Sequence, residues 1–195
     1  MRRCAMSEYS PTWYELFLQP IAPEQTEREA AFVARWLPHP GFTGVLDLCC
    51  GVAGPGRFLT RELGCGYLGV DASASAVAIA SERAGDLPCR FVTARVPPLP
   101  AGSFDVVLLL ETMLGFEDKD ALVREIAAAL RPGGRLAFTL EEGAPLTTAE
   151  RAAMPDADTV WLTPLDEIAG STERAGVALT WQEDHSAAHL SLIHI

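Results

Sequence analysis

The sequence predicts an α/β fold of the Rossmann-like, doubly wound type, with a mostly parallel sheet and helices on both faces. Short apolar runs alternate with longer stretches whose apolar residues recur at helical spacing, which is typical of βαβ units. The first run, Val45–Leu48, is apolar on both faces, as a buried parallel strand requires. A turn with Gly51 and Gly54 follows, and Asp71 comes twenty residues after Gly51. A strand, a glycine turn, a helix and a spaced acid together indicate a site for a nucleoside-containing ligand.

The first 40 residues are predicted to form a helical cap ahead of a core that spans residues 41–195. Two helices are expected, Ser10–Leu18 and Pro23–Leu37. Apolar residues at helical spacing support the second helix, and two prolines end it: Ala30, Val33, Trp36, Leu37, Pro38 and Pro40. An aromatic cluster in the first helix is typical of the apolar face of a docked helix: Tyr9, Trp13, Tyr14 and Phe17. The alternative is a lid that closes over the active site, in which Tyr14 contacts the substrate.

The first half of the core is expected to alternate strictly between strands and helices. Gly51 and Gly54 let the backbone turn sharply after the first strand, and the helix Pro55–Leu63 begins there. The remaining elements of this half are a strand at Tyr67–Asp71, a helix at Ser75–Ala84 and a strand at Cys89–Ala94. The proline-rich stretch 96–103 is then extended and stiff.

The second half continues with a strand at Phe104–Leu110 and a helix at Asp118–Leu130, in which apolar residues recur every four positions. The run Arg131–Gly134 is a helix stop and turn, and Arg135–Leu140 is the next strand.

An insertion at about 142–164 interrupts this alternation. It carries a short helix, Thr148–Met154, and an insertion after a core strand often covers a site. The helix Asp166–Gly176 and a sixth strand, Val177–Glu183, return to the core pattern.

Composition excludes several classes of protein. The net charge of -11 disfavours a nucleic-acid partner, because phosphate backbones are bound by clustered basic residues. No apolar run approaches the roughly 18 residues of a membrane span, so we expect a cytoplasmic protein with no membrane partner. The five cysteines lack metal-ligand spacing, and no metal site is expected. The oligomeric state does not follow from the sequence.

Four motifs resemble those of the class I S-adenosylmethionine-dependent methyltransferases, especially the small-molecule branch of type 11 and type 25. They are LDLCCGVAGPGRFL, LGVDAS, LPAGSFD and LRPGGRLAFT, and they occur in the family's order and spacing within residues 45–140. The resemblance implies an enzyme that transfers a methyl group from S-adenosyl-L-methionine to a small molecule, at a nitrogen or oxygen more than at carbon or sulfur. The fold of this family has seven strands. Only twelve residues follow Glu183, so we expect the last strand to be missing.

The resemblance also implies a set of cofactor-binding residues. Asp47 and the turn would hold the methionine part, and Asp71 would accept hydrogen bonds from the ribose hydroxyls. The whole set is Asp47, Cys49, Gly51, Ala53, Gly54, Asp71, Ala72, Ala94, Arg95, Val96 and Leu110. From the residues alone, the alternatives are a turn former at a strand end for Asp47 and a helix cap for Asp71, and the family's spacing of the two acids favours the cofactor contacts over both.

The chain departs from the family pattern at three of these positions. Cys49 and Ala53 replace the usual first and third glycines, which narrows the turn without abolishing it. Arg95 stands where many members carry an aspartate for the adenine amine, and an arginine cannot accept that hydrogen bond. Adenine is then held by backbone groups near Ala94 and Val96 and by apolar contacts, or Arg95 points to solvent.

Glu111 is the predicted catalytic residue. It directly follows the apolar run of the fourth strand, where an acid can orient an amine or act as a base, and it is equally a solvated loop acid. Glu141 and Glu142 end the fifth strand, and because neighbouring residues on a strand face opposite ways, only one of them is expected to point inward. Tyr14, Glu111 and Glu142 are the predicted substrate contacts.

Two other functions remain open at this point. A nicotinamide-dinucleotide oxidoreductase shares the strand, turn, helix and acid, although the glycines do not fit GxGxxG because its second glycine would fall at Ala53. The third hypothesis is a cofactor-binding module without catalysis.

Overall fold

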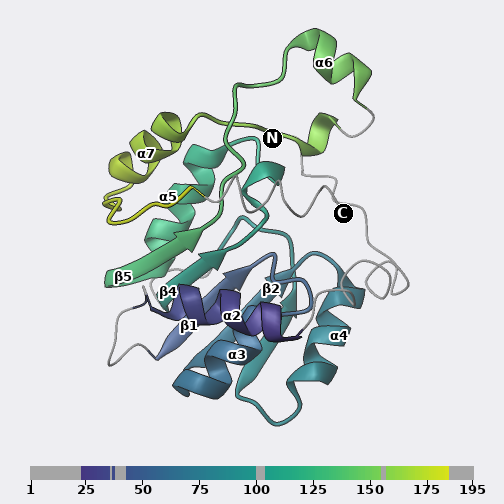
Figure 1. The fold of residues 1–195 in the computed structure, drawn as a ribbon, viewed down its shortest axis with the longest axis vertical. Coiled ribbons are helices and arrows are strands. Elements are labelled where there is room, and N and C mark those ends of the chain that lie inside the picture. Colours follow the sequence, from purple (N-terminus) through teal and green to yellow (C-terminus); the bar gives the residue numbers. More distant parts are fainter. Residues whose placement is uncertain (1–22, 36, 38–42, 100–103, 155–156, 185–195) are drawn as a thin grey trace.

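The computed structural model describes residues 23–35, 37, 43–99, 104–154 and 157–184. Within these residues, the core is one open sheet of five parallel strands in the order β3-β2-β1-β4-β5 (Figure 1). The strands are β1 Gly44–Leu48, β2 Gly66–Asp71, β3 Cys89–Thr93, β4 Phe104–Leu109 and β5 Leu130–Phe138. The predicted Rossmann-like fold is confirmed.

Helices cover both faces of the sheet. One face is covered by α3 (Gly54–Leu63) and α4 (Ala74–Ala84), and α2 (Pro23–Ala34) packs on α3. The other face is covered by α5 (Lys119–Ala129), which packs on α7 (Leu165–Arg174) (Figure 1). Two buried clusters result, because the side chains of each strand alternate between the faces. Val45 belongs to the α3 side and Leu46 to the α5 side.

The predicted turn Arg131–Gly134 lies inside the fifth strand as an irregularity. Leu130 pairs with Phe104, and the next pair along β4 joins Val106 to Arg135. The chain therefore passes from α5 into β5 with no separate loop and bulges out before the regular ladder begins. Gly133 takes a φ of 79° there, which glycine adopts without steric cost.

A hydrogen-bond cluster ties the amino-terminal ends of β1 and β4 together. Asp105 Oδ2 accepts from the backbone N–H groups of Thr43 (2.8 Å) and Gly44 (3.0 Å). Arg131 Nη1 lies 3.0 Å from both carboxylate oxygens of Asp105. The bulge of β5 thus places Arg131 beside the amino-terminal ends of β1 and β4. This edge of the sheet is opposite the edge that carries the glycine turn.

The predicted sixth strand is wrong. Residues 177–184 belong to no strand, and the Leu179 side chain is 50% exposed. The segment instead packs through side chains: the rings of Trp181 and Phe32 lie 5.5 Å apart, and Arg135 Nη1 donates to Thr180 Oγ1. Alternation of apolar residues predicts an extended chain but does not specify a pairing partner.

The insertion carries α6 (Thr148–Ala153), which lies away from the sheet (Figure 1). A bridge between Glu142 and Thr163 closes its base. The described residues also contain the 3-10 turn η1 (Met113–Gly115) after β4 and the 3-10 turn η2 (Ala157–Thr159) inside the insertion, after α6. Helix α2 begins at the predicted Pro23 and ends three residues before the predicted Leu37, whereas the helix predicted at Ser10–Leu18 lies outside the described residues.

Within the described part of the chain, no helix is both long and apolar enough to cross a bilayer. The same residues contain no group of three or more His, Cys, Asp or Glu side chains arranged to hold a metal ion.

Candidate active site

The candidate site lies at the carboxyl-terminal ends of β1, β2 and β4. The chain leaves β1 toward β2 on one side, and β4 pairs with β1 on the other side, so the strand order reverses between β1 and β4. Ligands of open α/β sheets bind outside this reversal. The glycine turn, Asp71 and Glu111 all follow strands that end there.

The turn after β1 has three residues in the left-handed region. Cys49, Gly51 and Ala53 have φ values of 56°, 50° and 56°. Cys49 and Ala53 therefore adopt the conformation that glycine favours, which confirms that the two replacements keep the turn. Ala53 N donates to Cys50 O at 2.8 Å and closes it.

Helix α3 begins directly after this turn. Ala53 is its N-cap residue, and among the described residues no side chain caps the helix. Because Pro55 has no N–H, the backbone N–H groups of Gly54 and Gly56 are the ones available at this end to an anionic group such as a carboxylate. A side-chain carbon on Gly54 would lie 2.9 Å from Thr26 Cγ2, so the glycine also lets α2 approach the turn.

Asp71 connects the ends of β1 and β2. Its Oδ2 accepts from Gly51 N at 2.9 Å, and its Oδ1 accepts from Ser73 N at 2.8 Å. The spacing of twenty residues thus joins the acid to the glycine turn itself. Ser73, not Asp71, caps α4, because the Ser73 side chain accepts from Ala76 N. Each carboxylate oxygen keeps a second lone pair for a ligand.

Asp47 is buried in β1 beneath the turn. Tyr67 donates a hydrogen bond to Asp47 Oδ2 at 2.6 Å. Burial raises the pKa of Asp47 to about 7, and the nearby Asp71 charge adds to the rise, while the Tyr67 hydrogen bond opposes it. Asp47 thus supports the turn from below, and its predicted contact with the methionine part stays a prediction.

Cys50 packs under the same turn. It is buried against Gly69, where an added Cβ would lie 2.8 Å from the Cys50 sulfur. Burial raises the pKa of the Cys50 thiol, and the Asp47 charge adds to the rise. A thiol with a raised pKa is unreactive, in agreement with a packing role for this cysteine.

The remaining predicted cofactor residues follow β2, β3 and β4. Ala72 is exposed after β2, and Leu110 is half-buried after β4. Ala94 N donates to Asp71 O at 2.8 Å, which holds the end of β3 beside the end of β2. Arg95 is exposed, and Val96 lines a cavity. The structure brings these residues to one edge of the sheet.

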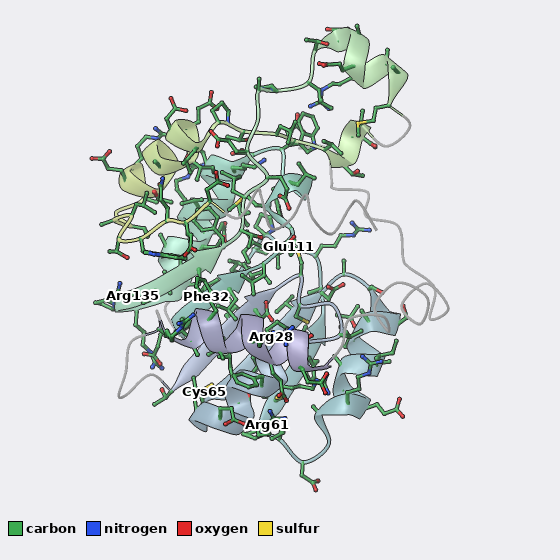
Figure 2. All side chains as sticks on the ribbon, viewed as in Figure 1. Arg28, Phe32, Arg61, Cys65, Glu111 and Arg135 are labelled. Carbon is green, nitrogen blue, oxygen red and sulfur yellow. The ribbon has the colours of Figure 1, made fainter. Side chains whose placement is uncertain are left out.

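Glu111 is exposed at the end of β4 (Figure 2). Its φ of 58° is unusual for a residue with a side chain, and such strain often occurs at functional positions. Glu111 N donates to Thr139 Oγ1, so a residue after β5 helps to fix this conformation.

The structure separates the two acids after β5. Glu142 is exposed, and its Oε1 accepts from Leu165 N at the start of α7. Glu141 Oε2 is buried without a hydrogen-bond partner among the described residues. The substrate contact predicted for Glu142 stays a prediction, and that of Tyr14 lies outside the described residues.

Lys119 is a buried cation near this edge that the sequence did not reveal. It is 5% exposed, and its ammonium donates to the carbonyls of Phe116 and Trp161. Burial lowers the pKa of Lys119, and the Glu141 charge opposes this. Lys119, Phe116 and Trp161 line one side of a cavity of about 1210 Å³ between α5, α7 and the insertion. The sequence could not reveal this role, because no local pattern shows that a lysine on a helix will bind backbone carbonyls of distant segments.

Comparisons with known proteins agree with this site. A family model described as "Methyltransferase domain" matches residues 45–134. "Methyltransferase GfsG" of Streptomyces halstedii is 34% identical over 48% of this chain and 36% of its own length. The 27-O-demethylrifamycin SV methyltransferase of Amycolatopsis mediterranei is 32% identical over 84% of this chain and 64% of its own length. The chain thus spans between about a third and two thirds of these relatives.

A solved structure shows the same fold. Phosphoethanolamine N-methyltransferase 2 of Haemonchus contortus aligns with a TM-score of 0.74 and 23% identity, over 88% of this chain and 43% of that chain. The family match assigns the glycine turn to a methyltransferase and not to a nicotinamide-dependent oxidoreductase. Residues 45–134, which hold β1 to the bulge of β5, thus match a methyltransferase domain, and in this part the chain is similar to the class I S-adenosylmethionine-dependent methyltransferases.

Proposed function

We propose that this chain transfers a methyl group from S-adenosylmethionine to a nitrogen or oxygen atom of a small molecule. The observation that carries the proposal is the uncapped start of α3 beside a turn that Asp71 holds in place. Free N–H groups suit the cofactor's carboxylate, and a carboxylate beside them suits ribose hydroxyls. The names of two similar proteins support this acceptor class. One is a 27-O-demethylrifamycin SV methyltransferase, and the other is a phosphoethanolamine N-methyltransferase.

Residues at different strand ends would bind different parts of the cofactor. Asp47, Cys49, Gly51, Ala53 and Gly54 form the turn for the methionine part, with Asp47 acting from beneath. A Cβ added at Gly51 would have no atom within 4 Å, so the turn faces open space. Asp71 and Ala72 would hold the ribose. Ala94, Arg95, Val96 and Leu110 would surround the adenine, with Arg95 using its apolar stem.

When bound, the cofactor supplies a methyl group on a positively charged sulfur. The chain must then align the acceptor with that methyl group and keep water away. Glu111 extends from the end of β4 and would orient the acceptor or take its proton. The insertion and η1 would cover the acceptor, because Trp161 N donates to Leu114 O and holds the two segments together.

Thermal shift and calorimetric titration with S-adenosylmethionine, S-adenosylhomocysteine and NAD test the cofactor. The first two are expected to raise the melting temperature and NAD is not, because a ligand of the native state alone stabilises it. A shift with NAD alone would overturn the proposal. S-adenosylhomocysteine formation with a library of amines, alcohols and phenols then identifies the acceptor. If the cofactor binds and none of these acceptors gives product, the hypothesis of a cofactor-binding module without catalysis is favoured. The cytoplasmic location and the lack of a nucleic-acid partner stay predictions.

A further inference from the structure

Two side-chain oxygens stand out among the described residues because they are buried and have no hydrogen-bond partner. They are Thr112 Oγ1 and Glu141 Oε2. Native proteins satisfy nearly all of their buried polar groups, so each exception needs an explanation. The fold does not supply one here, since both groups lower the stability of the ligand-free chain.

The two groups occupy equivalent positions after neighbouring strands. Leu109 of β4 is registered with Phe138 of β5, and Thr112 and Glu141 each lie three residues farther on. The strand ends stay together beyond the sheet, because Thr139 N donates to Leu109 O and Glu111 N donates to Thr139 Oγ1. Thr112 and Glu141 therefore follow neighbouring strand ends at one edge of the sheet. Glu111, which directly precedes Thr112, is labelled in Figure 2.

The buried ammonium of Lys119 does not satisfy Glu141. Lys119 interacts with it electrostatically, yet its ammonium donates to the carbonyls of Phe116 and Trp161. Lys119 thereby links the end of η1 to the insertion, as Trp161 N does by donating to Leu114 O. Glu141 Oε2 remains without a hydrogen-bond partner among the described residues.

We propose that Glu141 and Thr112 bind the methyl acceptor, and that the acceptor presents an N–H or O–H donor to this pair. The proposal rests on the proposed function and narrows its substrate class to amines and hydroxyl compounds. The carboxylate of Glu141 only accepts hydrogen bonds, whereas the Thr112 hydroxyl both donates and accepts. A ligand with a donor satisfies both oxygens, and an apolar ligand leaves both unpaired. The acid that faces the acceptor is therefore Glu141, and Glu142 serves the start of α7.

A binding experiment uses matched probes that differ only in the donor. Benzylamine, benzyl alcohol and toluene are titrated, with detection by saturation-transfer NMR, into the full chain saturated with S-adenosylhomocysteine. The wild type should bind the first two more tightly than toluene, and Glu141→Gln should weaken them about tenfold. Glu82→Gln, an exposed change on α4, is the control. The inference would be overturned if toluene bound as tightly as benzylamine and benzyl alcohol, or if Glu141→Gln left their affinity unchanged. A loss of affinity in Glu142→Gln but not in Glu141→Gln would also overturn it.

A second experiment needs no cofactor, so it decides the inference even if the proposed function fails. Thr112→Val removes an unpaired buried hydroxyl at constant shape, and the melting temperature of the ligand-free chain should rise by about 2–4 °C. Thr60→Val is the matched control, because the buried Thr60 hydroxyl accepts from Cys89 Sγ, and its melting temperature should fall. A fall in Thr112→Val would show that the hydroxyl serves the fold, which contradicts the proposal. Failure of S-adenosylhomocysteine to bind would instead count against the proposed function.

Discussion

Tyr67 of β2 donates a 2.6 Å hydrogen bond to Asp47 of β1, and both side chains are buried beneath the turn that starts α3. Helix α3 crosses the Tyr67 ring so closely that an added Cβ at Gly56 would lie 2.0 Å from ring carbon Cε2. The position of the turn therefore depends on a buried phenol and a buried carboxylate that are hydrogen-bonded to each other.

Asp47→Asn should make the stability of the chain less sensitive to pH. The folded pKa of Asp47 is raised from 3.8 to about 7, so the folded chain holds a proton there that the unfolded chain loses. Its contribution is fully present below pH 4 and is lost as pH rises through 7, on the order of 4 kcal/mol. Urea unfolding at pH 5 and 8 should show about 2–3 kcal/mol of this fall in the wild type and not in the variant, because the rest of the loss occurs between pH 4 and 5. Tyr67→Phe should enlarge it, and an unchanged slope in Asp47→Asn would contradict the assignment.

Gly56→Ala should destabilise the fold by about 1–3 kcal/mol, because the Tyr67 ring is buried and has no room to move. Chemical denaturation measures the loss. Gly170→Ala in α7 is the control: its Cβ would meet only the mobile end of Arg174, at 3.1 Å, and helix propensity favours alanine by up to about 1 kcal/mol. Equal stability of the two variants would show that α3 shifts freely over Tyr67.

Asp71→Ala should weaken S-adenosylmethionine binding by about 1–3 kcal/mol, as expected for a lost hydrogen-bond partner. It should also lower stability, because Gly51 N and Ser73 N lose their acceptor. Calorimetric titration and urea unfolding separate the two effects. Unchanged affinity would refute the ribose assignment, even if stability falls.

Asp105→Asn should destabilise the chain by about 1–3 kcal/mol at pH 7. Burial raises the pKa of Asp105, but hydrogen bonds from Thr43, Gly44 and Arg131 outweigh it, and the pKa is lowered. The contribution is present above about pH 4 and is lost as pH falls through the folded pKa. The difference between wild type and variant in urea unfolding should therefore shrink at pH 3. Arg61→Met, which breaks exposed ion pairs, should cost less stability than Asp105→Asn.

Glu111→Gln should keep the affinity for S-adenosylmethionine and reduce kcat for an acceptor from the screen. The change is nearly isosteric, so a lower kcat reports the lost carboxylate and not altered packing. Glu173→Gln, exposed on α7, is the control. Unaltered turnover would identify Glu111 as a solvated loop acid.

The strands that pair inside the sheet were predictable to within one or two residues, apart from the start of β5, because burial on both faces leaves a continuous apolar run, as in Val45–Leu48. The segment 177–183 has an equally regular alternation, but pairing depends on a free strand edge at the right distance, which no local pattern encodes. The bulge at Arg131–Gly134 was predicted as a turn; its membership of β5 depends on the register with β4.

The cofactor side of the site was more predictable than the acceptor side. Gly51 and Asp71 are linked by a spacing that the βαβ unit imposes, so sequence distance specifies their contact. Glu141 and Thr112 are related only through the register of β4 and β5, and a missing hydrogen bond is visible only in three dimensions. The sequence could not decide which of Glu141 and Glu142 faces the site, because neighbouring side chains of an extended chain point in opposite directions. An error of one residue in the predicted end of β5 therefore exchanges the two acids.

The reversal of strand order between β1 and β4 has an evolutionary consequence. Residues 45–96 carry the predicted cofactor site except Leu110, whereas the predicted acceptor contacts from Glu111 to Glu142 follow β4. The two halves join along the β1–β4 ladder, whose backbone hydrogen bonds tolerate changes of side chain. Recombination between residues 96 and 104 would therefore give a lineage new acceptors while it inherits most of an existing cofactor site.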